Sequence, residues 1–328
     1  MKISLMIGVL RRVVTRLIWT FVALALLLRF TVGDSNRALA VIYYITPIPV
    51  FPLLFLVAGI VGYPGRSWSW NDTSTNSSRS FFSPNFINLY LGLICLSWVI
   101  SSEFRFSRRP DSANDLRIVF WNVQRMNSSL GGLAAELRNW NAPVIALVEA
   151  NRQDKSMLAE WQQELSEYTI VGTKFDGVIA VRGSVATYPL HILSANSYCQ
   201  QFDVNSDGTE FTLMLVDIAS DLGRSRRDPL LELANLCEKI VRDRPVVIVG
   251  DFNTPDDSIW FQPLRQNFRE AFRMYGHGYA ATWPIPLPVL KLDQIWVNDR
   301  IDVSECQTGW TVSSDHRPVV SNLSIRAR

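Results

Sequence analysis

Apolar residues follow two different patterns, which divide the chain into two parts. The first part has three long apolar segments: Val13–Phe30 around an uncharged centre, Ala38–Gly62 with no charge in 25 residues, and the shorter Phe86–Ile100. Because about 20 apolar residues suffice to cross a bilayer, the pattern predicts a membrane anchor over residues 1–104. We expect about three transmembrane helices there, at about residues 10–30, 38–62 and 84–101.

The first apolar segment also has features of a signal peptide. Basic residues precede it, and the sequence ALA at residues 38–40 resembles a cleavage site. The second segment begins at that same place and is long enough to span a bilayer, which favours an anchor. Pro47, Pro49 and Pro52 should bend or break this second helix, which a transmembrane helix tolerates where neighbours satisfy the freed carbonyls.

The second part alternates short apolar runs with helical patterns, after a polar linker over residues 105–114. Runs typical of strands lie at residues 116–123, 143–150, 177–183, 211–219, 245–252 and 292–298. Helical periodicity covers Leu130–Trp140, Asp154–Glu167 and Pro229–Arg242. This alternation predicts an α/β domain over residues 115–328.

Charge separates the same two parts. Residues 1–110 hold 11 Lys or Arg and three acidic residues, whereas residues 111–328 hold 21 basic and 27 acidic residues. A surface that binds nucleic acid nonspecifically is usually basic, so the acidic second part argues against long duplex DNA as a partner. Four cysteines and three histidines are scattered without metal-binding spacing, which argues against a zinc site.

Residues with carboxylate, carboxamide or imidazole side chains lie at the ends of several predicted strands. They are Asn122, Glu149, Asp251 with Asn253, Asp293 at a strand start, and Asp315 with His316 before a final strand. Each alone is typical of a turn. Together they match the needs of phosphate-ester hydrolysis: carboxylates for a hard divalent cation, a base for an attacking water, and donors that face phosphate oxygens.

The motifs WNV, ALVEAN, GVIAVR, VGDFN, LDQIWV and SSDHRPV resemble those of the endonuclease/exonuclease/phosphatase superfamily, in order and spacing, over about residues 115–325. The resemblance implies a four-layer α/β sandwich, in which two mixed β-sheets pack face to face with helices outside. It also implies Mg²⁺ or Mn²⁺ as the cofactor and a phosphate ester as the substrate.

Residue roles also come from the resemblance. Glu149 and Asp315 correspond to the acidic residues at the metal, and Asn122 to the asparagine that supports the metal site and the substrate phosphate. Asp251 corresponds to the aspartate that orients the nucleophilic water, and Asn253 to the residue that binds the phosphate.

The remaining two roles form a pair. His316 corresponds to the histidine that contacts the scissile phosphate and takes part in acid/base chemistry. Asp293 corresponds to the aspartate that holds this histidine in one tautomer, as a carboxylate beside an imidazole commonly does.

One position departs from the family pattern. Asp217 stands where many members have a histidine, at the end of the strand before VGDFN. A carboxylate there would repel a phosphate unless it is protonated or bound to metal, so the departure puts protonation of the leaving group in doubt. Gln124 replaces the acidic residue of abasic-site endonucleases, which argues against that subfamily.

Two further segments have open alternatives. Trp283, in a Pro-rich run, would line a substrate groove or anchor the packing of its loop. Three arginines, Arg224, Arg226 and Arg227, would neutralise a phosphorylated substrate or form a solvated loop.

The sequence therefore predicts a membrane-anchored, divalent-metal-dependent phosphoesterase that acts on a nucleic acid or a phospholipid-type substrate. The lipid bilayer is an expected partner through the N-terminal helices. The location would be multi-pass in the plasma or inner membrane, with the catalytic domain on the extracytoplasmic side. The alternative function is a catalytically weak relative that binds a phosphorylated ligand or a partner protein, an interpretation that Asp217 supports. A transporter is disfavoured, because the predicted spans contain no acidic residue.

Overall fold

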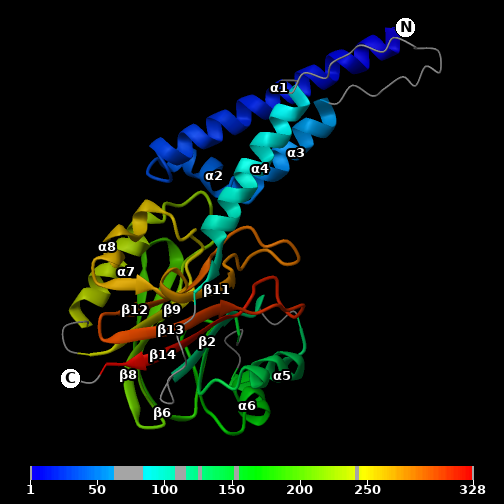
Figure 1. Ribbon diagram of the computed structural model, residues 1–328. Helices are drawn as coiled ribbons and strands as arrows, with labels where there is room; N and C mark the ends of the chain where they lie inside the picture. Colours follow the sequence, from blue (N-terminus) through cyan, green and yellow to red (C-terminus); the bar gives the residue numbers. More distant parts are fainter. Residues whose placement is uncertain are drawn as a thin grey trace. The chain divides into compact units, whose positions relative to one another are not determined.

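The computed structural model describes residues 2–62, 84–107, 116–124, 128–150, 155–240 and 244–326. The chain forms two compact units, Met1–Ser102 and Glu103–Arg328. Figure 1 shows the helices of the first unit in blue and cyan and the sheets of the second in teal to red.

The first unit contains four helices in its described residues: α1 (Lys2–Thr31), α2 (Arg37–Ile45), α3 (Val50–Gly62) and α4 (Pro84–Glu103, which ends in the second unit). Among the described helices, only α1 is by itself long and apolar enough to cross a membrane, over Met6–Thr31. Its length, composition and place near the N-terminus fit a signal sequence or a single anchor.

The expected multi-pass anchor is not supported. The second predicted span is divided into α2 and α3, whose axes differ by 70°. These two helices are long enough to cross a membrane only when they are taken together. Pro47 and Pro49 lie between the two helices, where they interrupt helical hydrogen bonding. The apolar part of the third segment, Ile87–Glu103, is shorter than the length required of one span.

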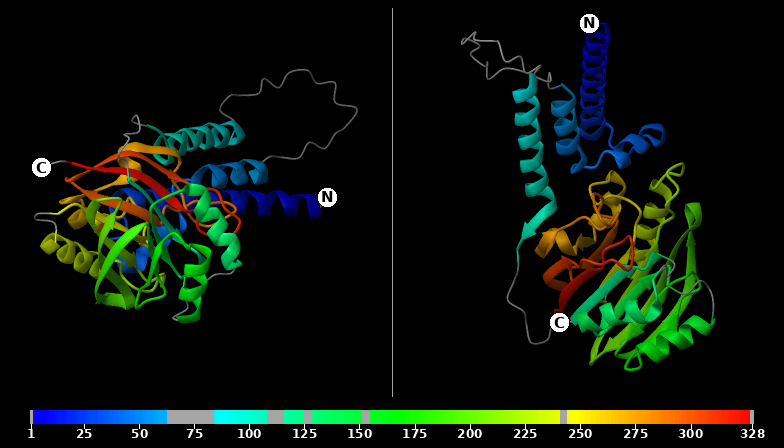
Figure 2. Two further views of the ribbon diagram at one scale, coloured as in Figure 1. Left: turned by 90° about the horizontal axis from the view of Figure 1, so that it is seen from below. Right: turned by 90° about the vertical axis from the view of Figure 1, so that its right-hand side faces the viewer.

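The second unit contains two mixed sheets. The eight-stranded sheet has the order β1 (Phe104–Phe106), β11 (Gly276–Tyr279), β13 (Ile301–Thr308), β14 (Val319–Ile325), β2 (Leu116–Asn122), β3 (Val144–Val148), β5 (Val178–Val181), β4 (Thr169–Gly172). The six-stranded sheet has the order β10 (Phe268–Glu270), β12 (Asp293–Asn298), β9 (Val246–Asp251), β8 (Thr209–Asp217), β7 (Ser197–Ser206), β6 (Gly183–Leu193). The colours of Figure 2 show the last strand, β14 in red, beside the much earlier β2 in teal.

The described helices of this unit are α5 (Leu130–Trp140), α6 (Lys155–Glu164), α7 (Arg227–Ile240), α8 (Gln262–Arg265) and α9 (Ala271–Tyr275), with short 3₁₀ turns at Ser194–Asn196 and Ile259–Phe261. One apolar core joins the facing sides of the two sheets. A second core packs α5 and α6 on the eight-stranded sheet, and a third packs α7 and α8 on the six-stranded sheet. These cores give the predicted four-layer α/β sandwich, with α7 and α8 on one side and α5 and α6 on the other (Figure 1).

The expected linker begins inside the fold rather than outside it. Phe104–Phe106 form β1, which pairs with β11, so residues 105 and 106 belong to the sheet; residues 108–114 lie outside the described residues. The Phe104 ring stacks on Tyr279 at 4.9 Å, and the Ala280 N–H donates to the Glu103 carbonyl. The second unit therefore starts at Glu103 rather than at residue 115.

Strand periodicity directs the polar strand-end residues inward. Alternate residues of β2, including Ile118 and Phe120, contribute to the core between the sheets, so Asn122 continues that same face. The same alternation in β9 places Asp251 beyond Val247 and Val249. The polar residues therefore lie where the core between the two sheets ends.

A partly buried ionic cluster ties together three segments near this end of the core, around Asp256, Glu270–Arg273 and Lys291. The Lys291 ammonium lies 2.6 Å from Glu270 Oε2 and 3.4 Å from Asp256 Oδ2, and the Arg273 guanidinium lies 2.7 Å from Asp256 Oδ2. Burial raises the pKa of Asp256, but the charges of Lys291 and Arg273 more than offset this and lower it to about 2.

We expect Asp256→Asn to destabilise the protein by about 2 kcal/mol at pH 7, because the neutral amide no longer forms ion pairs with Lys291 and Arg273. The pKa in the folded state lies below its ordinary value of 3.8, so the stabilisation is complete above pH 4 and is lost as the pH falls through about 2. Urea denaturation of wild type and variant at several pH values measures the difference. A difference that does not shrink between pH 4 and pH 2 would contradict this explanation.

Candidate active site

Asn122, the last residue of β2, links two carboxylates from different sheets. Its side-chain amide donates to Glu149 Oε1 at 3.2 Å and to Asp251 Oδ2 at 3.0 Å. Its side-chain oxygen, Oδ1, accepts the Gln124 N–H at 2.9 Å. Since the side chain is 1% exposed, these three bonds fix the amide and bring Glu149 and Asp251 to one place.

Asp251 is held by donors on both of its oxygens. Asp251 Oδ1 accepts the Asn253 N–H at 2.9 Å, while Oδ2 accepts from Asn122. Asn253 adopts a left-handed backbone with φ 44°, and its side-chain amide donates to the Ile218 carbonyl at 2.8 Å. The turn after β9 thus orients the carboxylate as well as ending the strand.

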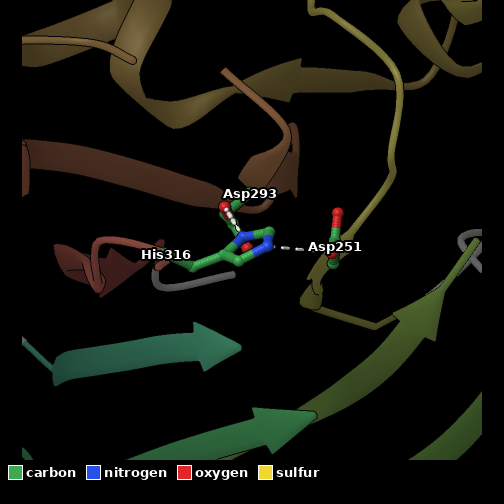
Figure 3. A group of neighbouring side chains, drawn as sticks. All are labelled: Asp251, Asp293 and His316. Carbon is green, nitrogen blue, oxygen red and sulfur yellow. Dashed lines mark hydrogen bonds and ion pairs between the residues drawn. The ribbon is translucent and has the colours of Figure 1, made fainter. Parts of the chain in front are cut away.

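His316 lies between two aspartates. His316 Nδ1 is 2.8 Å from Asp293 Oδ2, and Nε2 is 4.0 Å from Asp251 Oδ2 (Figure 3). The His316 carbonyl accepts the Trp121 indole N–H, and its backbone N–H donates to the Ser314 hydroxyl. The imidazole is therefore fixed both through its ring and through its backbone.

Asp315 has partners that sequence reasoning did not assign to it. The Trp283 indole N–H donates to Asp315 Oδ2 at 3.0 Å, and the Asp315 N–H donates to Gln124 Oε1 at 3.3 Å. The other carboxylate oxygen, Oδ1, is buried and accepts no hydrogen bond. These contacts between segments far apart in sequence place Gln124 and Trp283 beside Asp315.

Three aspartates form a row across adjacent strands. Asp217 of β8 is in register with Asp251 of β9, which is in register with Asp293 of β12. Registered neighbours point to the same face of a sheet, about 5 Å apart between strands. Asp217 therefore lies directly beside Asp251, at the position where many family members were expected to have histidine.

The pKa values of Asp251 and His316 are both raised. Burial and the Asp293 carboxylate raise the pKa of Asp251 to about 6, against the lowering effects of His316 and of the hydrogen bonds that Asp251 accepts. Burial lowers the pKa of His316, but the Asp293 and Asp251 carboxylates more than offset this and raise it to about 10. At neutral pH the site therefore pairs an imidazolium with carboxylates.

We expect the His316 imidazole of the metal-free protein to remain protonated at pH 8. Asp293→Asn should lower its pKa by about 1 to 3 units, because the nearest opposite charge is removed. Titration of the imidazole by NMR measures both values. As a control, Asp302→Asn, which breaks a surface ion pair with Arg326, should leave the His316 titration unchanged.

The sequence of this region matches the model of the Endonuclease/Exonuclease/phosphatase family over residues 119–316, which is more than half of the chain. The chain belongs to the endonuclease/exonuclease/phosphatase family. The family hydrolyses phosphoester bonds, and the matched segment begins in β2 and ends at His316. A comparison with curated proteins found no match.

Several solved structures share the fold. An endonuclease/exonuclease/phosphatase family protein from Bacteroides thetaiotaomicron has a TM-score of 0.54 at 13% identity, over 66% of this chain and 99% of that chain. The mannosyl-6-phosphatase of B. thetaiotaomicron VPI-5482 has a TM-score of 0.52 at 15% identity, over 64% and 100%. TDP2 of D. rerio, complexed with a single-strand DNA product, has a TM-score of 0.50 at 14% identity, over 64% and 99%.

The donor set fits the divalent cation that the family implies. Among the described residues, Asp251, Asp293 and His316 form one group whose potential ligand atoms lie within 4.8 Å of one another, and this group could hold a metal ion. The predicted ligands Glu149 and Asp315 are not part of that group. Buried carboxylate oxygens without a partner, Asp293 Oδ1 and Asp315 Oδ1, mark places where a cation would compensate charge.

Proposed function

We propose that this chain is a divalent-metal-dependent phosphoesterase that hydrolyses P–O bonds in a nucleic acid or a phospholipid-type substrate. One observation carries the proposal: Asn122 joins Glu149 to Asp251 at the end of the core between the sheets, within reach of His316. A turn would need none of these contacts. A site that binds a cation, a water and a phosphate together would use all of them.

Asp251 is the proposed base for the attacking water. Donors from Asn122 and Asn253 hold its two oxygens in place, and a pKa of about 6 leaves it ionised yet basic near neutral pH. Asn253, fixed by its own contacts, would donate to the phosphate with the second hydrogen of its side-chain amide. Asn122 would keep the base and Glu149 in one arrangement.

His316 is the proposed cationic donor to the phosphate. Its Nδ1 faces Asp293, so Nε2 is the nitrogen available for a phosphoryl oxygen or for a proton transfer. Asp293 would hold the tautomer and stabilise the imidazolium. A positive donor aimed at developing negative charge is the arrangement that favours the transition state of hydrolysis.

Glu149 and Asp315 are the proposed holders of Mg²⁺ or Mn²⁺. Hard cations prefer oxygen ligands, whereas the His316 imidazole already has a partner in Asp293. A bound ion would act as a Lewis acid on a phosphoryl oxygen and neutralise its charge. It would also relieve the repulsion among the carboxylates of this site.

A tether to the bilayer through α1 is part of the proposal, because α1 has the length and composition of a single anchor. Structural relatives include a mannosyl-6-phosphatase and a protein complexed with a single-strand DNA product, which is why the panel below contains both a sugar phosphate and nucleic acids. The second candidate function is a binding module with little turnover. Asp217 favours it, since a third carboxylate beside Asp251 repels a phosphate.

The test uses the full chain in detergent with Mg²⁺ or Mn²⁺. The panel contains DNA, RNA, sphingomyelin, a phosphoinositide, mannose 6-phosphate and bis-p-nitrophenyl phosphate, with Asp251→Asn as the matched inactive variant. Metal-dependent turnover that the variant lacks supports the hydrolase and selects its substrate class. No turnover on the whole panel, with metal bound, would reject the hydrolase in favour of the binding module.

A further inference from the structure

Arg226 is a buried cation next to the proposed site that the hydrolytic roles leave unused. It is 1% exposed and lies in the segment between β8 and α7. Its Nε donates to the Asn253 carbonyl at 3.2 Å, and its Nη1 donates to the Asp221 carbonyl at 3.0 Å. The guanidinium thus joins the turn after β9 to the segment after β8.

Asn253 depends on such a contact because its backbone is strained. A non-glycine residue with φ 44° lies in the left-handed region, which costs free energy unless the surroundings compensate it. Three atoms of Asn253 have partners: the N–H with Asp251, the side-chain amide with Ile218, and the carbonyl with Arg226. Asp251 and Ile218 lie at the ends of β9 and β8, whereas Arg226 lies outside both strand ends.

The backbone of Arg226 is also fixed. Its carbonyl accepts the Leu230 N–H at 3.3 Å, the first helical hydrogen bond of α7. The Asp221 carbonyl accepts the Arg224 N–H as well as Arg226 Nη1, which closes a tight turn. Arg226 therefore reaches Asn253 from a helix start, and helix starts move little compared with loops.

We propose that Arg226 is a positioning residue that acts through Asn253, holding the side-chain amide of Asn253 toward the substrate phosphate. This inference rests on the role proposed above for Asn253. Lysine in place of Arg226 keeps the charge but loses the planar fork that reaches two carbonyls at once. The Asn253 carbonyl would lose its partner, and the left-handed turn would relax.

The test is a double-mutant cycle on the full chain in detergent, with bis-p-nitrophenyl phosphate and Mg²⁺. Arg226→Lys should lower kcat by about 10- to 100-fold, as expected for a small displacement of a catalytic group, with little change in KM. In an Asn253→Ala background, Arg226→Lys should cause no further fall in kcat. Arg244→Lys is the matched control: this arginine is exposed and pairs with Asp203 at 2.8 Å, so its replacement should leave kcat unchanged.

Additive losses in the two backgrounds would overturn the proposal, since they would show that Arg226 acts independently of Asn253. If Arg226→Lys does not fold, Arg226→Gln, which keeps one N–H donor, takes its place. A crystal structure of the variant gives a readout that does not need turnover: Asn253 should leave φ near +44° while Asp251 stays in place. An unmoved Asn253 would overturn the positioning role, whereas a wild type without turnover would count only against the proposed function.

Discussion

Asp251→Asn should lower kcat by about 100- to 10,000-fold, the range expected for loss of a positioned general base. The amide keeps the size of the carboxylate and one acceptor oxygen, so the hydrogen bond to either Asn253 or Asn122 can persist. What disappears is the ability to take a proton from water. Initial rates on the best substrate of the panel measure the effect.

The same substitution should not destabilise the protein. Burial and Asp293 raise the pKa of Asp251 from its ordinary value of 3.8 to about 6, so ionisation of this carboxylate costs stability as the pH rises above 3.8, and the cost is complete above about 6. Removal of that charge offsets the one hydrogen bond that the amide loses, so the melting temperature of the metal-free protein should change little. If turnover is lost while the melting temperature is unchanged, the substitution acts on catalysis and not on folding.

Asp302→Asn is the control for this experiment. Asp302 pairs with Arg326 at 2.7 Å near the surface of the same unit, and surface ion pairs contribute little to stability. Its replacement should change neither kcat nor the melting temperature appreciably. If Asp251→Asn retained more than a tenth of wild-type turnover, Asp251 could not be the base.

Removal of divalent metal should abolish turnover, and Mg²⁺ or Mn²⁺ should restore it. Because a ligand that binds only the folded state stabilises it, saturating metal should add about 2.7 kcal/mol at 100 times its Kd. Glu149→Gln should reduce that gain, since a neutral amide binds a hard cation more weakly. Differential scanning calorimetry with and without EDTA measures the gain.

The choice of metal discriminates between two sets of ligands. Zn²⁺ binds imidazole readily, so restoration by Zn²⁺ alone would point to Asp251, Asp293 and His316 as the ligands. Restoration by Mg²⁺ would favour Glu149 and Asp315. Undiminished turnover in EDTA would contradict metal dependence altogether.

The periodic pattern predicted an α/β domain, because buried strands and amphipathic helices leave a periodic record in the sequence. The four layers were implied by the family resemblance. The predicted helix at Leu130–Trp140 is confirmed to the residue. Ser129 caps its start, and Asn141, with φ 46°, ends it in the left-handed conformation. Polar residues that stop an apolar run are equally visible, which is why Asn122 and Asp251 could be chosen.

Other features left no such record. β6 is largely exposed and carries an irregular register around Pro189, so it lacks the apolar alternation that marks a strand. Contacts between Trp283 and Asp315, or between Arg226 and Asn253, depend on how distant segments pack. The break between α2 and α3 was visible as prolines, but its 70° bend was not.

The indole of Trp283 gives the site an optical reporter. Its N–H donates to Asp315, and its ring centroid lies 6.4 Å from that of His316. Indole emission responds to nearby charge, so a cation or an anion that enters beside Asp315 should change the intrinsic fluorescence of the protein. Trp283→Phe should remove that change, which would allow ligands to be screened by light alone, before any substrate is known.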